Sequence, residues 1–330
     1  MNIETAPRLP FIIAEAAQGY EGNEKVVDLL IKATASAGAD AVKFQIMVAD
    51  DSALPDYQHY ESYKKLELPW EVWENAIQEA HRRNIMFYME ALGTTAIEKL
   101  SSKGIDGYKI HATNIKNEKI LKLVAATKKA VLLSTGGCEK EEIDRALAIL
   151  EGCEVTIMHG FQAVPTGLPD NHIRRIVTLR EIYGLPIGFQ GHTDGDSEFA
   201  PLVPLLALGA GAILVEQHIT LSRKAKMRDH ISALNTEEFA RWVTMIRQIS
   251  SALGNKEWVL TEKEREYRKE MRRAVCSLVD IAKGETVKED HIAFKRTARA
   301  DVIYDLREVI GKMATRVIAR NSPLKKEDFM

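Results

Sequence analysis

Charged and polar side chains recur at the ends of short apolar segments along roughly the first 255 residues. The segments FIIAEA, DAVKFQ, YKI, VLLS, TIMHG, IGFQGH and ILVEQH carry them in chain order: Glu15, Lys43, Gln45, Lys109, Ser134, His159, Gln190, His192, Glu216 and His218. Carboxylates, amines and imidazoles are the groups that bind anions, hold metals and transfer protons in enzymes. Their placement at the ends of apolar segments is typical of an enzyme active site.

These residues need a scaffold that brings the segment ends together. Continuous apolar runs are typical of buried strands in a parallel sheet, and one more run, IMFYM, occupies residues 85–89. Segments with helical periodicity separate the runs, at residues 23–37, 70–83, 96–103, 118–128, 140–150, 172–183, 199–208 and 236–253. Eight strand-and-helix units in about 250 residues predict an α/β fold, a (β/α)8 TIM barrel. A doubly wound open sheet is the alternative, but no G-x-G-x-x-G motif follows the first strand.

Composition narrows the class of protein. The 330 residues carry a formal net charge of −2 without a basic patch, which argues against nucleic-acid binding. No apolar stretch of about 18 residues predicts a membrane span, and the N-terminus lacks the pattern of a signal peptide. We therefore expect a cytoplasmic protein. The three scattered cysteines, Cys138, Cys153 and Cys276, indicate neither a disulfide framework nor a C-x-x-C metal site.

The alternation of apolar strand segments and helical segments ends near residue 255. The segment KEWVLTEKEREYRKEM is dense in charge, which suits a solvated linker or a linking helix. The next segment, RRAVCSLVDIAKGETVKEDHIAFKR, predicts two short strands around a turn at Lys283-Gly284-Glu285. We expect a barrel at residues 1–255, a linker at 256–270 and a small β-rich domain at 271–330. A unit of about 60 residues is small, so it is expected to pack on its own barrel or on a partner chain.

Two lysines and a glycine-rich turn point to an anionic ligand. Lys43 and Lys109 lie in apolar segments and can donate hydrogen bonds to a carboxylate or phosphate. We disfavour salt-bridged or solvated lysines there, because an unpaired charge in such a segment costs several kcal/mol. The turn at 134–137 precedes a helix that begins near Glu139, so it offers backbone N–H groups to an anion. Glycines in such turns also occur for steric reasons alone.

Two histidines point to a metal. His192 and His218 lie at the ends of the seventh and eighth expected strands, which are neighbours in a barrel. A lone histidine at a strand end is more often an ordinary hydrogen-bonded residue, but two on adjacent strands favour a metal site. Imidazole suits Mn, Fe or Zn, and two protein ligands leave positions open for water and substrate.

The chain resembles the N-acetylneuraminate (sialic acid) and nonulosonic acid synthases, in which a barrel is followed by an antifreeze-like (SAF) domain. The resemblance covers nearly the whole chain. It rests on IAE at 13–15, AGADAVKFQ at 37–45, KI at 109–110, LSTGG at 133–137, GHTDG at 191–195, LGAGAILVEQH at 208–218, and RR, KGE and KR in the tail. It implies a metal-dependent aldol-type condensation of phosphoenolpyruvate with an amino-sugar aldehyde of the N-acetylmannosamine type, with release of phosphate.

The resemblance also implies roles for particular residues. His192 and His218 match the metal ligands, with Mn expected first and Mg, Co or Fe as alternatives. Glu15 and Asp229 match acidic residues that bind the amino sugar, although a Glu15–Lys43 salt bridge and a solvated Asp229 are the structural alternatives. Arg296 matches an arginine that the tail inserts into the sugar site of the partner subunit, which implies a homodimer with swapped tails. Glu15, Lys43, Lys109 and Asn114 are the expected catalytic residues, and Gln45, Glu90, Ser134, His159, Gln162, Gln190, Asp229 and Arg296 are the expected substrate-binding residues.

Several positions depart from the family pattern. Met89-Glu90-Ala91 stands where the family has Ser-Thr-Pro, and the K-I-x-S-x-E pattern becomes Lys109-Ile110-His111-Ala112-Thr113-Asn114. The usual Ser-Asp-His becomes Gln190-Gly191-His192, Tyr-Pro becomes Val164-Pro165, Thr297 replaces a proline, and extra residues occur around 196–201. Either His111, His159, Gln162 and Gln190 rebuild the phosphate pocket, or the donor is no longer phosphoenolpyruvate, since Glu90 repels a phosphate.

Two other functions stay open. One is an aldolase or lyase that uses Lys43 or Lys109 as a Schiff base on a keto-sugar acid. The other is a degenerate barrel that binds sugar without catalysis. The presence together of Lys43, Lys109, His192 and His218 argues against the second.

Overall fold

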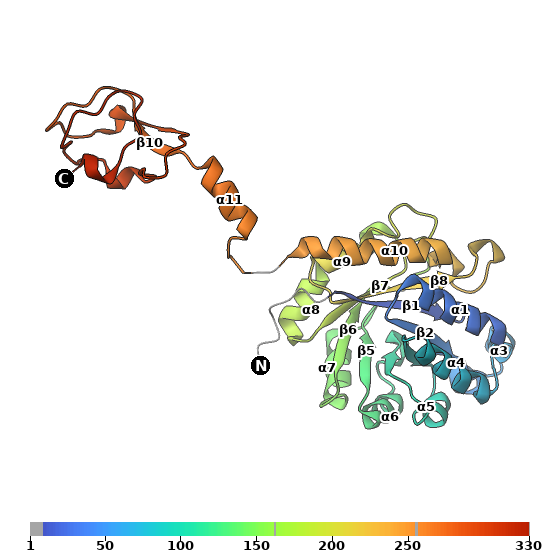
Figure 1. Cartoon of the computed structure of the whole chain (residues 1–330). Helices are drawn as coiled ribbons and strands as arrows, with labels where there is room; N and C mark the ends of the chain where they lie inside the picture. Colours follow the sequence, from blue (N-terminus) through green and yellow to red (C-terminus); the bar gives the residue numbers. More distant parts are fainter. Residues whose placement is uncertain (1–8, 162, 255–256, 330) are drawn as a thin grey trace. The chain divides into compact units, whose positions relative to one another are not determined.

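The computed structural model describes residues 9–161, 163–254 and 257–329, and the chain forms two compact units, Met1–Asn255 and Lys256–Met330. The first unit is a closed barrel, as predicted (Figure 1). Its parallel strands pair in chain order and the first pairs with the eighth: β1 Phe11–Ala17, β2 Ala41–Ile46, β3 Met86–Ala91, β4 Gly107–Ile110, β5 Ala130–Ser134, β6 Val155–His159, β7 Ile187–Gly191 and β8 Leu214–Thr220. A two-residue strand, β9 (Leu234–Asn235), pairs with β8.

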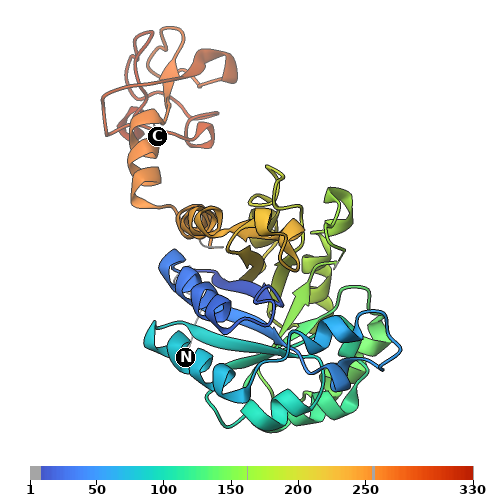
Figure 2. The same cartoon turned by 90° about the vertical axis from the view of Figure 1, so that its right-hand side faces the viewer.

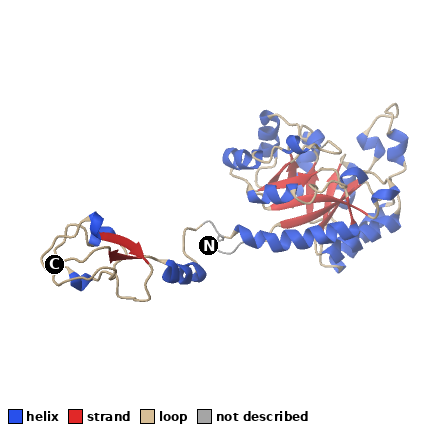
Figure 3. Cartoon of the chain, turned by 90° about the horizontal axis from the view of Figure 1, so that it is seen from above, coloured by secondary structure: helices blue, strands red, loops and turns tan. Residues whose placement is uncertain are grey.

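Helices form the outer layer of the barrel, and the views in Figures 2 and 3 show them around the strands. The main ones are α1 Glu24–Ala37, α4 Trp70–Arg82, α5 Thr95–Leu100, α6 Glu118–Thr127, α7 Lys140–Ile149, α8 Arg175–Tyr183, α9 Val203–Gly209 and α10 Thr236–Ile249. Each falls within a segment predicted to be helical, give or take a few residues. Two short helices, α2 Ala49–Ser52 and α3 Tyr60–Lys64, lie in the segment between β2 and α4, where the sequence predicted no element.

Side-chain caps explain several helix starts. Asn23 accepts a hydrogen bond from the backbone N–H of Lys25 at the start of α1, and Glu139 and Asn235 form capping boxes at α7 and α10. α8 begins three residues later than predicted, because Leu168–Asn171 form a 3-10 turn and His172 adopts a left-handed φ of 42°.

The period of two along each strand arranges the barrel interior in rows. Outward-facing residues such as Val42 and Phe44 pack under the helices in the main core. The inward-facing residues at one level form a floor row: Ile13, Ala41, Tyr88, Gly107, Leu132, Met158, Gly188 and Leu214. Its apolar side chains pack together as one cluster, so this end of the barrel is a filled core.

Two residues further along each strand, the same face becomes polar. We call this level the polar row: Glu15, Lys43, Glu90, Lys109, Ser134, Gly160, Gln190 and Glu216. Another step of two gives the rim row: Gln45, His111, Gly136, His192 and His218. Parallel strands align their carboxyl ends, so the two rows face the barrel mouth where enzymes of this fold place their active sites.

The second unit begins with α11 (Glu262–Met271), whose first turn is closed by a capping box between Thr261 and Glu264. β10 (Ala274–Ser277) and β11 (Ile292–Lys295) form an antiparallel pair. Val275, Ile281, Val287, Ile303 and Leu324 are among the residues of a separate small core. Among the residues that the structure describes, no helix is long and apolar enough to cross a membrane.

Candidate active site

Lys43 and Lys109 lie among three carboxylates in the polar row. Lys43 Nζ forms ion pairs with Glu15 Oε2, with Glu90 Oε2 at 2.9 Å and with Glu216 Oε1 at 3.7 Å. Lys109 Nζ lies 2.5 Å from Glu216 Oε1. All five residues are at most 2% exposed. The expectation that these lysines are not salt-bridged is therefore wrong: the pairing is what allows five charged groups to be buried.

The electrostatics of the cluster follow from burial and proximity. Burial lowers the pKa of Lys43, while Glu216 and Glu90 oppose that shift. Burial pushes the pKa of Glu216 upward, but the charges of Lys109 and Lys43 outweigh it and bring that pKa down to about 2. For Glu90 the same balance, with Lys43, Lys109 and His111 opposing burial, leaves the pKa below its ordinary value. Glu216 and Glu90 are thus ionised at neutral pH.

His192 and His218 are brought together at the rim. Their ring centroids lie 5.1 Å apart, and the residues are 5% and 6% exposed. Burial lowers the pKa of His192 to about 4 and that of His218 well below its usual value, so both imidazoles are neutral. His192 Nδ1 is buried without a hydrogen-bond partner among the described residues. Neutral adjacent imidazoles suit a divalent metal, although within the described ranges no three or more histidine, cysteine or carboxylate residues form a metal-binding group.

His111 and Asn114 follow β4. The Thr113 backbone N–H donates to His111 Nδ1 at 3.2 Å, and His111 Nε2 lies 3.9 Å from Glu90 Oε1. Burial lowers the pKa of His111. Asn114 donates from Nδ2 to the Leu92 carbonyl at 3.4 Å, so its amide also holds the β3 loop.

Ser134, His159 and Gln190 lie at the ends of β5, β6 and β7. Ser134 Oγ and Gln190 Oε1 are buried and have no hydrogen-bond partner in the described part of the chain. Gln190 Nε2 donates to the Gly160 carbonyl at 3.1 Å, and His159 Nε2 lies 2.9 Å from the Asn171 carbonyl. His159 therefore holds the β6 loop, while Ser134 and Gln190 keep free polar atoms. Gln162 lies outside the described residues.

Gln45, Glu15 and Asp229 occupy the β1, β2 and β8 side of the mouth. Glu15 Oε1 accepts the Ala17 backbone N–H at 2.7 Å, and Gln45 Oε1 accepts from Gln18 Nε2 at 3.0 Å. Burial raises the pKa of Asp229, which also senses the charges of Glu90 and Lys43. The charge of the neighbouring Arg228 opposes the effect of burial on Asp229 most strongly.

Glu216 belongs to the charged cluster, although it was not among the site residues expected from the sequence. The signal was present, since Glu216 and His218 are two residues apart on one strand and share a face. Arg296 follows β11 in the second unit, where it is exposed.

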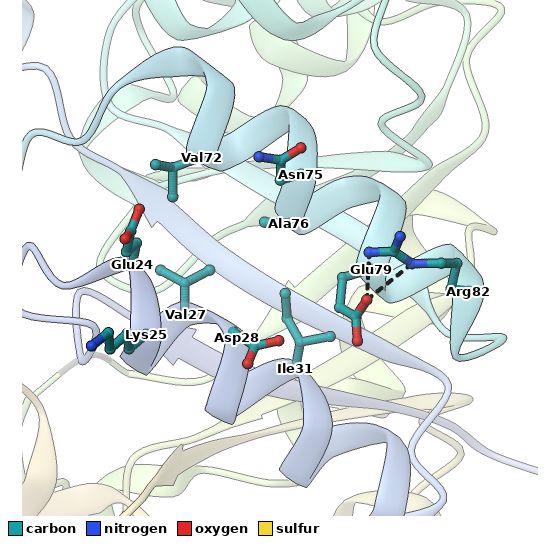
Figure 4. Close-up of a pocket in the computed structure, with 10 residues that line it drawn as sticks. All are labelled: Glu24, Lys25, Val27, Asp28, Ile31, Val72, Asn75, Ala76, Glu79 and Arg82. Carbon is teal, nitrogen blue, oxygen red and sulfur yellow. Dashed lines mark hydrogen bonds and ion pairs between the residues drawn. The ribbon is translucent and has the colours of Figure 1, made fainter.

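Two of the cavities in the described part of the chain bear on the site: one lies away from the polar row, and the other is lined in part by Gly160 of that row. Figure 4 shows one between α1 and α4, with Val27, Ile31, Val72 and Ala76 at its base and an Arg82–Glu79 ion pair at 2.6 Å. It contains none of the strand-end residues. A second cavity, of about 630 Å³, is lined by Thr135–Cys138, His159 and Phe161 among others, so it opens beside the ends of β5 and β6.

The comparisons with known proteins agree on one family. A model described as the NeuB family matches residues 30–258, and a model of the SAF domain matches residues 272–330. An uncharacterized Methanocaldococcus jannaschii protein, MJ1065, is 32% identical over 88% of this chain and 85% of its own length. The N,N'-diacetyllegionaminic acid synthase of Campylobacter jejuni is 28% identical, over 92% and 96%. The crystal structure of the Leptospira borgpetersenii N-acetylneuraminic acid synthetase superposes with a TM-score of 0.75 at 26% identity, covering 81% of this chain and 94% of that one.

Proposed function

Because the chain belongs to the NeuB family, we propose that it is a nonulosonic acid synthase that joins a phosphoenolpyruvate-type donor to an amino-sugar aldehyde and releases phosphate. One observation carries the proposal: Glu216, which pairs with both buried lysines, lies two residues before His218 on β8, and His218 is adjacent to His192. The two lysines suit an anionic donor and the two histidines suit a group that polarises an aldehyde.

The donor would bind over the polar row. Lys43 and Lys109 supply the cationic hydrogen-bond donors for its carboxylate and phosphate. Ser134 adds a hydroxyl that has no partner among the described residues. The carboxylates that now pair with the lysines hold them extended toward the barrel axis, so the lysines are oriented before the donor arrives.

His192 and His218 would hold a divalent metal, with Mn first and Mg, Co or Fe as alternatives. The neutral imidazoles and the unpartnered Nδ1 of His192 fit that group. When bound, the metal supplies Lewis-acid polarisation of the aldehyde oxygen. Two protein ligands leave open positions for the substrate.

The acceptor sugar would lie toward Glu15, Gln45 and Asp229. Their carboxyl and amide oxygens accept hydrogen bonds from hydroxyl and N-acyl groups. Asn114 cannot transfer a proton, because an amide does not titrate, so at that position the chain binds or orients a group only. We expect Arg296 of one copy to contact the sugar in the barrel of a second copy. Deletion of residues 271–330 should then raise the sugar KM and weaken dimerisation, and a fully active truncated chain would refute the shared site.

One observation favours the second candidate function, an aldolase or lyase that forms a Schiff base with a lysine. Burial lowers the pKa of Lys43, which is what a Schiff-base lysine requires. Borohydride treatment in the presence of pyruvate tests it, because only a Schiff base gives a stable adduct on Lys43. The ion pairs of Lys43 with Glu15 and Glu90 favour the charged amine, so we expect no adduct.

The experiment for the proposed function is phosphate release from phosphoenolpyruvate, with added divalent metal and a panel of amino-sugar and neutral-sugar aldehydes. Aldehyde-dependent phosphate release that is lost in Lys109→Met supports the proposal. Lys109→Met keeps most of the side-chain volume but leaves Glu216 with Lys43 alone, at 3.7 Å, so urea unfolding must show that the variant is still folded under the assay conditions. An absence of phosphate release with every aldehyde would argue against it.

A further inference from the structure

The polar row carries more negative than positive charge. Glu15, Glu90 and Glu216 face Lys43 and Lys109, so three carboxylates against two lysines leave one uncompensated negative charge in a fully buried cluster. A site for an anionic donor is expected to be neutral or positive, since like charges repel strongly where water is excluded. Protonation of one of the three carboxylates would make the row itself neutral, in addition to any positive charge that a divalent metal on the rim histidines would supply.

Glu90 has the fewest lysine and hydrogen-bond partners of the three carboxylates. Its Oε2 lies 2.9 Å from Lys43, but its Oε1 has no hydrogen-bond partner in the described part of the chain. Glu15 instead uses one oxygen for the Ala17 N–H and the other for Lys43. Glu216 also has an unpartnered oxygen, Oε2, but its Oε1 pairs with both lysines. Of the three, Glu90 alone combines a single lysine partner with a free oxygen.

Glu90 Oε1 is a buried polar atom whose hydrogen-bonding capacity is unused within the described residues. Glu90 Oε1 lies 3.9 Å from His111 Nε2, too far for a hydrogen bond, and the Glu90 side chain is 0% exposed. His111 Nδ1 lies 2.7 Å from Thr113 Oγ1 and 3.2 Å from the Thr113 backbone nitrogen, so the ring is held by Thr113 and not by Glu90. A proton on Glu90 Oε1 would break no existing hydrogen bond and would create a donor O–H inside the site.

We propose that Glu90 binds the anionic donor as its neutral acid, taking up one proton from solvent and donating Oε1–H to a donor oxygen. The inference rests on the proposed function. It gives Glu90 the role of a hydroxyl: the acid donates one hydrogen bond and adds no charge. The carboxylate form excludes the donor, so Glu90 makes donor affinity depend on pH.

Other groups around Glu90 also titrate or carry charge. They are Glu15 on β1, Lys43 on β2, Lys109 on β4, His111 after β4, Glu216 on β8 and Asp229 after β8. The donor phosphate has its own pKa of about 6. A variant that differs only at position 90 keeps all of these titrating groups. The ratio of the donor Kd of the wild type to that of the variant therefore isolates the contribution of Glu90.

The matched variant is Glu90→Gln, which keeps the shape, has an N–H donor and cannot ionise. Isothermal titration of each full-length protein with phosphoenolpyruvate alone, above about pH 7 where the phosphate is fully ionised, gives Kd and, from two buffers of different ionisation enthalpy, proton uptake. We expect the wild type to take up about one proton more than Glu90→Gln. The ratio of wild-type to variant Kd should rise about tenfold per pH unit, with the variant binding more tightly throughout.

Equal proton uptake in the two proteins, or a Kd ratio that does not change with pH, would overturn the inference while leaving the proposed function standing. An absence of phosphoenolpyruvate binding in both proteins would overturn the proposed function and the inference with it. Glu90→Thr, which carries a hydroxyl, is the second variant if Glu90→Gln does not fold. It should show the same loss of proton uptake.

Discussion

The floor row and the polar row lie on the same eight strands, two residues apart, and both are buried. The floor row is filled with apolar side chains such as Leu132 and Met158, which gain free energy by leaving water. The polar row instead buries five charged side chains, and a buried ion pair is weak support for stability because desolvation offsets its Coulomb energy. The floor row thus stabilises the barrel by apolar burial, whereas burial alone gives no such account of the polar row.

The largest effect on activity is expected at the rim row, which follows the polar row along the strands. We predict that His192→Ala and His218→Ala each lower turnover by roughly a thousandfold or more, because a metal contributes several kcal/mol to catalysis. Bound metal should be lost as well, measured by elemental analysis, while the circular dichroism spectrum stays unchanged. Stoichiometric metal in the double variant would remove both histidines from the metal site.

Loss of a lysine should destabilise the polar row through unpaired buried carboxylates. Lys43→Ala leaves Glu15 and Glu90 without their cation, and breaking a buried pair costs about 3–5 kcal/mol. Urea unfolding measures that loss. Lys43→Ala combined with Glu90→Gln should recover part of it, because one uncompensated charge is removed. Lack of any recovery would mean that the ion pairs do not set the stability of this row.

A substitution in the floor row should lower stability without lowering activity. We expect Leu132→Ala to cost about 2–5 kcal/mol of unfolding free energy through the cavity it leaves. Activity per folded molecule should stay close to that of the wild type, since Leu132 lies one level below the charged groups. A large drop in kcat without a change in stability would mean that the floor takes part in catalysis.

The smallest effect on stability is expected at Ser134. Its hydroxyl is buried without a partner in the described residues, so Ser134→Ala should change the free energy of unfolding by about 0.5 kcal/mol or less, or stabilise the protein. The donor Kd should nevertheless rise several-fold, because one hydrogen bond of about 1 kcal/mol is lost. An unchanged Kd would place the donor away from β5.

The sequence predicted the eight strands because buried parallel strands are continuous apolar runs, and it predicted most helices from their periodicity. It did not predict α2 and α3, because four and five residues are too short to show a period. The histidine pair was predictable from its position on neighbouring strands. The Glu15–Lys43 pair was named as an alternative from the sequence, and the structure contains it. The Lys109–Glu216 pair was not predicted, because the two residues are 107 positions apart, on β4 and β8, and only the closure of the barrel brings them together.

The measurement that tests the account most directly is a crystal structure of the protein with phosphoenolpyruvate and a divalent metal. The account predicts the phosphate and carboxylate of the donor in contact with Lys43 or Lys109, and the metal on His192 and His218. It also predicts Glu90 Oε1 within hydrogen-bond distance of a donor oxygen. A donor bound elsewhere, with Lys43 and Lys109 keeping all their carboxylate partners and no ligand, would contradict it.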